Sequence, residues 1–546
     1  MIKKFTNNFT KGEKISESIT RSAMLIATMG IASRFLGLLR DRILASHFGA
    51  GDILDAYYTA FKVPDLIYNL LILGALSAAF IPVFAALVAK NNKSKEAWKL
   101  VNTLLSVGAV VVAIVSVVLL IFSRGIINLI AFGYSDEKKE LVVQMTRIML
   151  LSPILLGISG VLGGILNSFK KFFFYSLSPI FYNLGIIIGA VFFTNFFGPL
   201  GLSLGVVLGA LMHLLIQLPE AYRCGFKFNF SFDWHSKYFQ KVIKLMIPRA
   251  MGIATAQVNL LIVIVLASTL KSGSLAIFNL ANNLQSVPLG LFGISFAIAS
   301  FPVLSRLWSK GETEEFISKL TDTLRKVIFL IIPFSALIYI LRAQIVRVVL
   351  GTGKFNWEDT TLTFTALGIF TFSLWAQSLI PLLARAFYAI HDTKTPFLIG
   401  IFSEGINIIL AIILIKQFDV LGLVSAFAIA TSLNALALYF WLRKKVGGIK
   451  NRGVIKTFGK VTLATIILII VVQFLKNIIG TELFGAEKTF LGIFVQLSFA
   501  LAGGIGAFIL MGKFLQIREL THFIKILHKK IIIKKVVPGA RDEVGK

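Results

Sequence analysis

The amino-acid sequence predicts an all-α polytopic membrane protein with about fourteen transmembrane helices, and three observations lead to this prediction. Of the 546 residues, 56% are hydrophobic and 15% are charged, whereas an ordinary soluble protein carries about 25% charged residues. Apolar runs such as 107–122 and 461–475 recur along the chain, and runs of about 20 apolar residues form membrane-spanning helices. The net charge of +29 is concentrated in alternate connecting segments. A soluble enzyme, a fibrous protein and a disordered chain are therefore excluded, and the excess of cations needs no nucleic-acid partner.

Each expected span is a hydrophobic stretch whose limits are set by Gly, Pro or charged residues. In chain order the spans cover residues 22–48, 53–89, 100–123, 140–168, 175–196, 200–222, 245–270, 274–305, 327–341, 359–390, 395–415, 420–442, 461–475 and 489–512. Some exceed 30 residues, which implies tilt, kinks or extension beyond the bilayer. The residues before the first span are mostly polar, so no cleavable signal peptide is expected and the first span itself directs insertion.

The distribution of cations orients these spans. Of the 55 Lys and Arg residues, 38 fall in the two tails and every second loop, whereas 10 fall in the opposite loops. Cytoplasmic loops accumulate Lys and Arg, so the first set, with both termini, is assigned to the cytoplasm. The seven cations within the spans are Arg34, Arg40, Arg42, Lys62, Arg147, Arg249 and Arg385. An intramembrane cation costs roughly 2.5–3.5 kcal/mol at the bilayer centre, although one near a helix end reaches the interface at far less cost.

An internal repeat divides the spans into two sets. MGIA at 29–32, LAS at 44–46 and Gly51 recur at 251–254, 266–268 and Gly273, all at an offset of 222 residues. In looser register Pro64 is echoed by Pro288, so the second and eighth spans are both expected to be kinked by proline. We expect two lobes of six helices each, at 22–222 and 245–442, joined by a cytoplasmic linker at 223–244. A cytoplasmic tail at 1–21 precedes them, and two further helices with their preceding basic loop follow at 443–512. The basic cytoplasmic tail at 513–546 is expected to lie on anionic membrane lipids. Two-lobed repeats of this kind are typical of transporters.

No sequence motif indicates an enzyme. The chain contains no GxxxxGK[ST], HExxH or GxSxG pattern, its six histidines are scattered, and its one cysteine, Cys224, excludes an internal disulfide and a cysteine-based metal cluster. We therefore expect a transporter without a tightly bound cofactor or metal.

The strongest local signal is a group of charges in the first two spans. Arg34 and Asp41 are seven residues apart and share a helix face, as do Asp55 and Lys62, while Arg40 lies about 120° from Arg34. On a structural interpretation, Arg34–Asp41 and Asp55–Lys62 neutralise each other and hold the lobe together. On a functional interpretation, the guanidiniums offer forked donors for phosphate and the acids orient them.

Weaker signals lie elsewhere. Glu404 and Asn407 share one face of the eleventh span, where they either take part in cation or proton coupling or are satisfied by neighbouring groups. Gly201, Gly205 and Gly209 permit a close approach of two helices. Arg249 follows a proline at the cytoplasmic start of the seventh span.

The sequence resembles the MurJ (MviN) family of bacterial lipid II flippases, within the multidrug/oligosaccharidyl-lipid/polysaccharide exporter superfamily. The residues that carry the resemblance are SRFLGLLRD at 33–41, HFGAG at 47–51, DA at 55–56, AFKVP at 60–64, GA at 74–75, AFIPV at 79–83, GKF at 353–355, ARAFY at 384–388, DTKTP at 392–396, LNA at 433–435 and LRKK at 442–445. They lie in order over roughly residues 20–450, and the first stretch is quite specific.

The resemblance implies a flippase that moves undecaprenyl-pyrophosphate-linked disaccharide pentapeptide to the outer leaflet of the bacterial cytoplasmic membrane. It implies alternating access through a cation-lined cavity between lobes, driven by membrane potential, Na⁺ or H⁺, and contact with the cell-wall synthesis machinery. The family's functional residues match Arg34, Arg40, Asp41 and Asp55. Lys62, Arg249 and Asn283 are further candidates for contact with the headgroup.

The sequence departs from the family pattern in two places. Tyr68 and Asn69 stand where many members have a basic residue after the proline of helix two. In helix eight, 281–288 reads ANNLQSVP, without the usual Asp-Arg pair and Glu, so amides such as Asn283 replace part of the expected cationic pocket. Three alternatives stay open: a flippase for another lipid-linked glycan, a cation-coupled drug antiporter of the same superfamily, and a structural scaffold for wall-synthesis enzymes.

Overall fold

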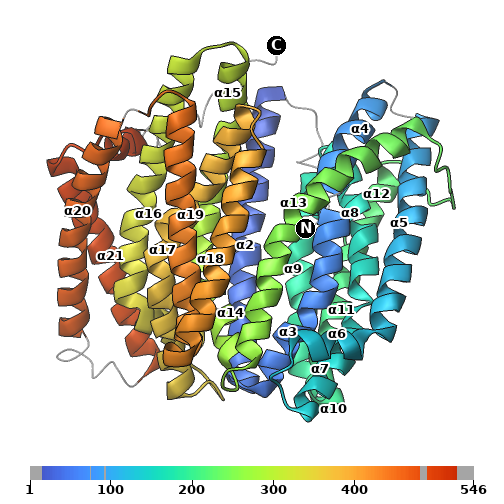
Figure 1. The fold of residues 1–546 in the computed structure, drawn as a ribbon, viewed down its shortest axis with the longest axis horizontal. Coiled ribbons are helices and arrows are strands. Elements are labelled where there is room, and N and C mark those ends of the chain that lie inside the picture. Colours follow the sequence, from blue (N-terminus) through green and yellow to red (C-terminus); the bar gives the residue numbers. More distant parts are fainter. Residues whose placement is uncertain (1–14, 74–75, 91–93, 450, 480–488, 526–546) are drawn as a thin grey trace, which may run out of the picture. The chain divides into compact units, whose positions relative to one another are not determined.

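The computed structural model describes residues 15–73, 76–90, 94–449, 451–479 and 489–525, and within these residues every regular element is a helix (Figure 1). The predicted all-α membrane fold is confirmed. Eleven helices of the described residues are long and apolar enough to cross a membrane. The other three predicted spans, 22–48, 53–89 and 245–270, also fall on helices. The basic tail beyond residue 525 lies outside the described residues.

The chain folds as two compact units. Unit 1 comprises residues 1–276 with 352–355, and unit 2 comprises 277–351 with 356–546. The seventh span therefore packs in unit 1, where α13 contacts α4, although the repeat had placed it in the second lobe. The division into lobes of six helices at 22–222 and 245–442 stays a prediction.

Unit 1 is built from helices of very different length. In order they are α2 (Ile15–Phe48), α3 (Asp52–Ile67), the π-helix η1 (Tyr68–Leu73), α4 (Leu76–Lys90), α5 (Lys95–Ile121), α6 (Ser123–Ile130), α7 (Asp136–Met149), α8 (Ser152–Ser168), α9 (Phe172–Ile188), the π-helix η2 (Gly189–Phe193), α10 (Thr194–Phe197), α11 (Leu200–Leu215), α12 (Leu218–Arg223) and α13 (Lys237–Ser268). The first turn of α14 (Ser274–Pro288) also belongs to unit 1.

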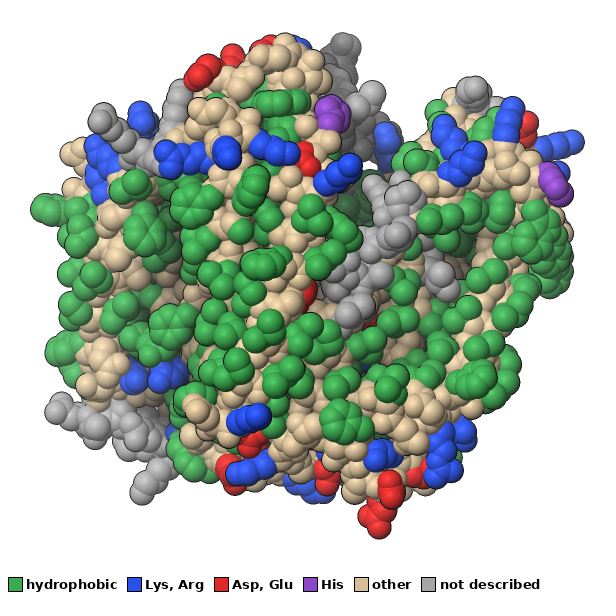
Figure 2. All heavy atoms as spheres, viewed as in Figure 1, with side chains coloured by type: hydrophobic (Ala, Val, Ile, Leu, Met, Phe, Trp, Pro, Cys, Tyr) green, Lys and Arg blue, Asp and Glu red, His purple; other side chains and the backbone are tan. Residues whose placement is uncertain are grey.

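Unit 2 continues from the second turn of α14. Its elements are the π-helix η3 (Leu289–Ile294), α15 (Ser295–Ser309), α16 (Thr313–Val349), α17 (Trp357–Ala389), α18 (Lys394–Phe418), α19 (Val420–Lys445), α20 (Asn451–Ile478) and α21 (Phe490–Phe514). On the face shown in Figure 2, hydrophobic side chains cover the middle of the helices and the charged side chains gather toward helix ends. This is the distribution that a bilayer requires, because charged groups avoid its hydrocarbon core.

The two prolines of the predicted repeat occupy equivalent places. Pro64 lies in α3 and is followed by η1, and Pro288 ends α14 and is followed by η3. Proline lacks an amide hydrogen and crowds the carbonyl four residues earlier, so each proline removes one hydrogen bond of its helix. In both places the α-helix then changes to a π-helix.

Glycines bring two helices of unit 1 into backbone contact. A Cβ at Gly185 of α9 would lie 2.3 Å from the Cα of Gly209 on α11, and a Cβ at Gly205 would lie 2.7 Å from the Cα of Gly189. No side chain fits at these separations. The close approach predicted from the glycine spacing is confirmed, and the helices gain dispersion contacts that lipid cannot supply.

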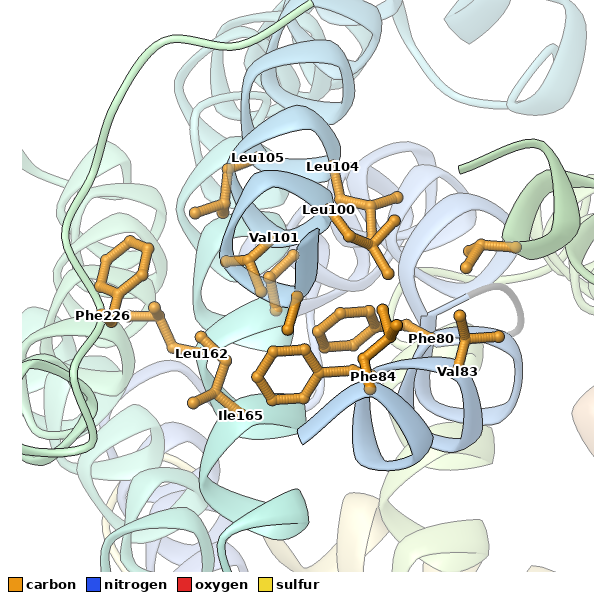
Figure 3. Close-up of a cluster of buried hydrophobic side chains, with 14 of the residues drawn as sticks. Phe80, Val83, Phe84, Leu100, Val101, Leu104, Leu105, Leu162, Ile165 and Phe226 are labelled. Carbon is orange, nitrogen blue, oxygen red and sulfur yellow. The ribbon is translucent and has the colours of Figure 1, made fainter. Parts of the chain in front are cut away.

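A buried apolar cluster fixes the end of unit 1 where α4, α5 and α8 meet. Phe80 and Phe84 are fully buried against Leu100 and Leu162, and Phe226 joins them from the segment after α12 (Figure 3). Phe80 and Phe84 stack with their ring centroids 5.1 Å apart. The cluster positions α5 for the contacts described below.

We predict that Gly205→Val lowers the thermal unfolding midpoint of the purified protein, because the new side chain forces α9 and α11 apart at a cost of about 1–3 kcal/mol. Gly108→Val is the matched control, since a Cβ at Gly108 of α5 meets nothing within 4 Å. Equal midpoints for the two variants would contradict the assignment of Gly205 to a helix contact.

Candidate functional site

The guanidinium of Arg40 is held in one orientation by two neighbours. Its Nε and Nη2 donate to Oδ1 of Asp41 at 3.0 and 2.8 Å, and its Nη1 donates to Oδ1 of Asn183 on α9 at 3.1 Å. Asn183 is itself positioned, because its Nδ2 donates to the carbonyl oxygen of Pro179 at 3.0 Å. The side chain of Asp41 is 4% exposed, whereas that of Arg40 is 22% exposed. Asp41 and Asn183 therefore fix the orientation of the Arg40 guanidinium, and part of this group stays accessible.

A second charged cluster joins the start of α3 to the start of α7. Asp52 and Asp55 lie in the first turn of α3, and Lys138 lies in the first turn of α7. The Lys138 Nζ lies 2.7 Å from Asp52 Oδ1 and 2.9 Å from Asp55 Oδ2, and it stands over the ring of Tyr134 at 3.9 Å. The side chains of Lys138 and Asp55 are 8% and 2% exposed. Two charges so deeply buried are tolerated because each is the partner of the other.

Asp55 also caps α14. The backbone N–H of Gly273 donates to Asp55 Oδ2 and that of Ala276 donates to Asp55 Oδ1, both at 2.8 Å, while the Ser272 hydroxyl donates to Asp52 Oδ1 at 2.7 Å. The first N–H groups of a helix have no partner within the helix, and a carboxylate there also interacts favourably with the helix dipole.

The turn before α14 requires glycine at its last position. The φ of Gly273 is +87°, and a Cβ would lie 2.0 Å from the carbonyl oxygen of Ala50. The turn is thus fitted closely to the chain that links α2 to α3.

A similar close fit holds residues 352–355 against the end of α2. The N–H of Lys354 donates to the Ser46 carbonyl at 2.8 Å, and a Cβ at Gly353 would lie 2.2 Å from the same oxygen. Phe355 is 4% exposed. The stretch GKF at 353–355 therefore has a packing role in unit 1.

The structure changes one of the two ion pairs that the structural interpretation offered. The expected pair of Asp55 with Lys62 is wrong, because the Asp55 carboxylate binds Lys138 and the start of α14. Lys62 is half-buried on α3, and Asp65 is the acid that acts on it electrostatically. Asp41 binds the adjacent Arg40, and Arg34 lies half-buried one to two turns earlier on α2.

The remaining predicted residues lie on other helices. The side chain of Arg249, on α13, lies outside the described residues. In unit 2, Asn283 is half-buried on α14, and on α18 Glu404 is half-buried and Asn407 is buried. The roles expected for these residues stay predictions.

Amide side chains of α14 bond to one another and to α17 in unit 2. Gln285, which is 1% exposed, donates from Nε2 to Oδ1 of Asn282 at 2.9 Å. Gln377 of α17 donates from Nε2 to Gln285 Oε1 and to the Ser373 hydroxyl, each at 2.9 Å. The uncharged helix-eight sequence therefore forms a neutral hydrogen-bonded chain with α17.

Sequence analysis did not identify Lys138 and Asn183. Lys138 follows Asp136 and Glu137 and precedes Lys139, a pattern typical of a solvated loop, and nothing in it reveals an acidic partner more than 80 residues away. Asn183 lies near the middle of the span expected at 175–196, and an amide at that depth was the available signal.

Comparison with known proteins assigns a family. The family model described as "Lipid II flippase MurJ" matches residues 22–517. A relative from Buchnera aphidicola subsp. Acyrthosiphon pisum, described as a probable lipid II flippase MurJ, is 28% identical over 515 residues, which are 93% of this chain and 99% of that protein. The Lipid II flippase MurJ of Burkholderia cenocepacia is 27% identical over 437 residues, covering 78% of this chain and 84% of its own.

Solved structures give the same result for the fold. A structure of "Lipid II flippase MurJ, inward closed conformation" matches with a TM-score of 0.74 and 26% identity, over 90% of this chain and 99% of that one. An inward-facing multidrug resistance MATE family transporter of the MOP superfamily matches with a TM-score of 0.64 at 16% identity, over 76% and 94% of the two chains. The second match concerns the fold alone.

We predict that Asp55→Ala destabilises the protein by about 3–5 kcal/mol, because it leaves the buried Lys138 ammonium without its buried partner and uncaps α14. Asp52→Ala, at a carboxylate that is 64% exposed, should cost less than about 1 kcal/mol. Thermal unfolding of the two purified variants measures the difference, and Lys138→Met added to Asp55→Ala should restore part of the loss. An Asp55→Ala variant as stable as Asp52→Ala would show that the buried pair contributes little.

Proposed function

This chain belongs to the MurJ family of lipid II flippases, and we propose that it moves undecaprenyl-pyrophosphate-linked disaccharide pentapeptide from the cytoplasmic to the outer leaflet of the bacterial cytoplasmic membrane. It is a transporter and not an enzyme. The family match over residues 22–517 carries this proposal, and the multi-pass helical fold agrees with it. On the charge distribution described above, both termini lie in the cytoplasm.

The oriented guanidinium of Arg40 on α2 supports a role of this residue in binding the pyrophosphate. A guanidinium has five N–H donors, and the three hydrogen bonds of Arg40 to Asp41 and Asn183 leave two donors for a ligand. Because the fork is already oriented, little side-chain entropy is lost when a phosphate binds. We assign Arg40 and Arg34 to the headgroup, Asp41 to positioning Arg40, and Lys62 and Arg249 to the surrounding positive potential.

On this proposal Asp55 does not contact the headgroup. Its carboxylate accepts from Lys138, Gly273 and Ala276, so it orders the starts of α3, α7 and α14. It is therefore a positioning residue. Asn283 contributes an amide where relatives carry charge, and it contacts the sugars or peptide of the headgroup by hydrogen bonds.

Transport by alternating access needs a driving force. We propose coupling to the membrane potential, Na⁺ or H⁺, with Glu404 and Asn407 of α18 as the responsive pair. The carboxylate of Glu404 is half-buried within a span, where the energy of its charge depends strongly on a bound cation or proton.

Arg40→Ala and Arg34→Ala are expected to abolish rescue of a bacterium depleted of its own lipid II flippase, because each variant removes a cation that binds the pyrophosphate. Arg40→Lys should rescue weakly, since an ammonium is a point charge without the fork. Arg124→Ala is the control, at a cation that is 75% exposed and 3.7 Å from Glu140. Growth on depletion measures rescue, with membrane levels of each variant measured in parallel.

Full rescue by both arginine variants would overturn the binding assignment. Failure of the parent to rescue, when it is inserted at normal levels, would favour a different lipid-linked glycan, which the uncharged α14 also allows.

Glu404→Gln is expected to remove the dependence of transport on the coupling ion while the protein still inserts and folds. Exposure of the lipid-linked substrate on the outer leaflet is measured while the Na⁺ concentration, the pH and the membrane potential are varied one at a time. An ion dependence identical to that of the parent would return Glu404 to a structural role.

A further inference from the structure

The segment between α12 and α13 has an unusual alternating sequence. Residues 226–234 read FKFNFSFDW. Residues 226–233 form neither helix nor strand, and Trp234 lies in a turn. We call residues 226–234 the aromatic segment. Figure 1 shows it as the green non-helical stretch beside α5. Every second residue of the segment is aromatic; Phe226 is buried, whereas the aromatic residues from Phe228 to Trp234 are exposed.

Side chains of α5 bind the backbone of the aromatic segment. Asn102 donates from Nδ2 to the Lys227 carbonyl at 3.1 Å and accepts from the Asn229 N–H at 3.2 Å. The Ser231 N–H donates to the Ser106 hydroxyl at 3.2 Å. These bonds replace the partners that a neighbouring strand would supply in a sheet.

Further contacts fasten the segment at both ends. Phe226 is 3% exposed and packs in the apolar cluster against Trp98, with the ring centroids 6.4 Å apart (Figure 3). At the other end Lys99 forms an ion pair with Asp233 at 2.7 Å. The segment therefore runs along α5 from Trp98 toward Ser106 and returns toward Lys99.

The contact with α5 lies within a membrane span. Asn102 and Ser106 are seven and eleven residues after the start of α5 at Lys95, which corresponds to about 10–17 Å along a helix. The hydrophobic span predicted from the sequence begins at residue 100. Asn102, Thr103 and Ser106 are polar residues at that depth, and all three are at most 5% exposed.

The outer side of the segment is apolar. Phe228, Phe230, Phe232 and Trp234 are 44%, 80%, 47% and 53% exposed. The surface of α5 beyond them is also apolar, with Val110, Val111 and Ile114 exposed on a span of mean hydropathy 3.1. The aromatic row thus continues the lipid-facing surface of α5 toward the headgroups.

We propose that the aromatic segment is inserted into the membrane, with its four exposed aromatic side chains among the phospholipid acyl chains just below the headgroups of the cytoplasmic leaflet. Non-helical backbone is tolerated at that depth only where protein satisfies its polar groups. Asn102 and Ser106 bind three backbone groups of the segment, and the Thr103 hydroxyl bonds to the Ser231 hydroxyl at 2.9 Å. Phe and Trp at the interface bury apolar surface in lipid, and Lys227 and Lys237 flank the row as partners for lipid phosphates. The connection between α12 and α13 is on this proposal a membrane anchor of unit 1 and not a free tether.

Spin-label accessibility in lipid nanodiscs tests this proposal. In a Cys224→Ser background, a nitroxide is attached to Phe230→Cys, to Val117→Cys on the lipid-facing side of α5, and to Asp136→Cys, at a side chain that is fully exposed. Relaxation by oxygen, which concentrates in lipid, is compared with relaxation by a water-soluble nickel chelate. The label at position 230 should resemble that at 117, with an oxygen-to-nickel ratio several-fold above that at 136.

A label at 230 that behaves like the one at 136 would overturn the proposal, because the segment would then face water. Low accessibility to both reagents would overturn it as well, since the side chain would then be packed against protein. As a second arm, Asn102→Leu keeps α5 apolar but removes two hydrogen bonds to the segment, and it should lower the oxygen-to-nickel ratio at 230 without changing that at 117. An unchanged ratio at 230 would show that Asn102 does not hold the segment in lipid.

Discussion

The buried ion pair of Lys138 with Asp55 is the interaction on which the start of several helices depends. Neither charge is solvated, so neither can lose its partner without a penalty of several kcal/mol. The same carboxylate accepts the N–H groups of Gly273 and Ala276. One side chain therefore fixes the first turns of α3, α7 and α14 together. A membrane protein has few such places, because lipid offers no alternative partner for a charge or for a free N–H group.

Because lipid offers a charge no alternative partner, the contacts of each cation also explain how Arg40 differs from Lys138. The donors of Lys138 are used by two acids and a tyrosine ring, so this cation is structural. Arg40 is held on one side by Asp41 and Asn183 and keeps part of its guanidinium exposed. An oriented cation with free donors in the first helix is what a pyrophosphate requires, and the family of the chain makes lipid II the natural ligand. On our proposal the aromatic segment meets the same constraint, since Asn102 and Ser106 of α5 supply hydrogen bonds to its non-helical backbone.

Much of the fold could be predicted from the sequence, because membrane spans are the strongest hydrophobic signal a chain can carry. Within the described residues, all fourteen expected spans fall on helices, and the glycines at 201, 205 and 209 lie at a close helix contact. Periodicity failed for the pairing of Asp55. It shows which residues share a face of one helix, as Asp55 and Lys62 do, but Lys138 reaches Asp55 from another helix. The repeat assigns α13 to the second lobe, whereas its contacts group it with unit 1, and the division into two lobes of six helices stays a prediction.

The central claim is that this chain carries lipid II across the membrane through Arg40, and the most direct test measures where lipid II lies. In cells where the chain is the sole flippase, the fraction of lipid II headgroups accessible to an impermeant probe on the outer leaflet is compared for the parent and Arg40→Ala. The account predicts ready access in the parent and loss of access in the variant, with total lipid II undiminished. Equal access in both would contradict it.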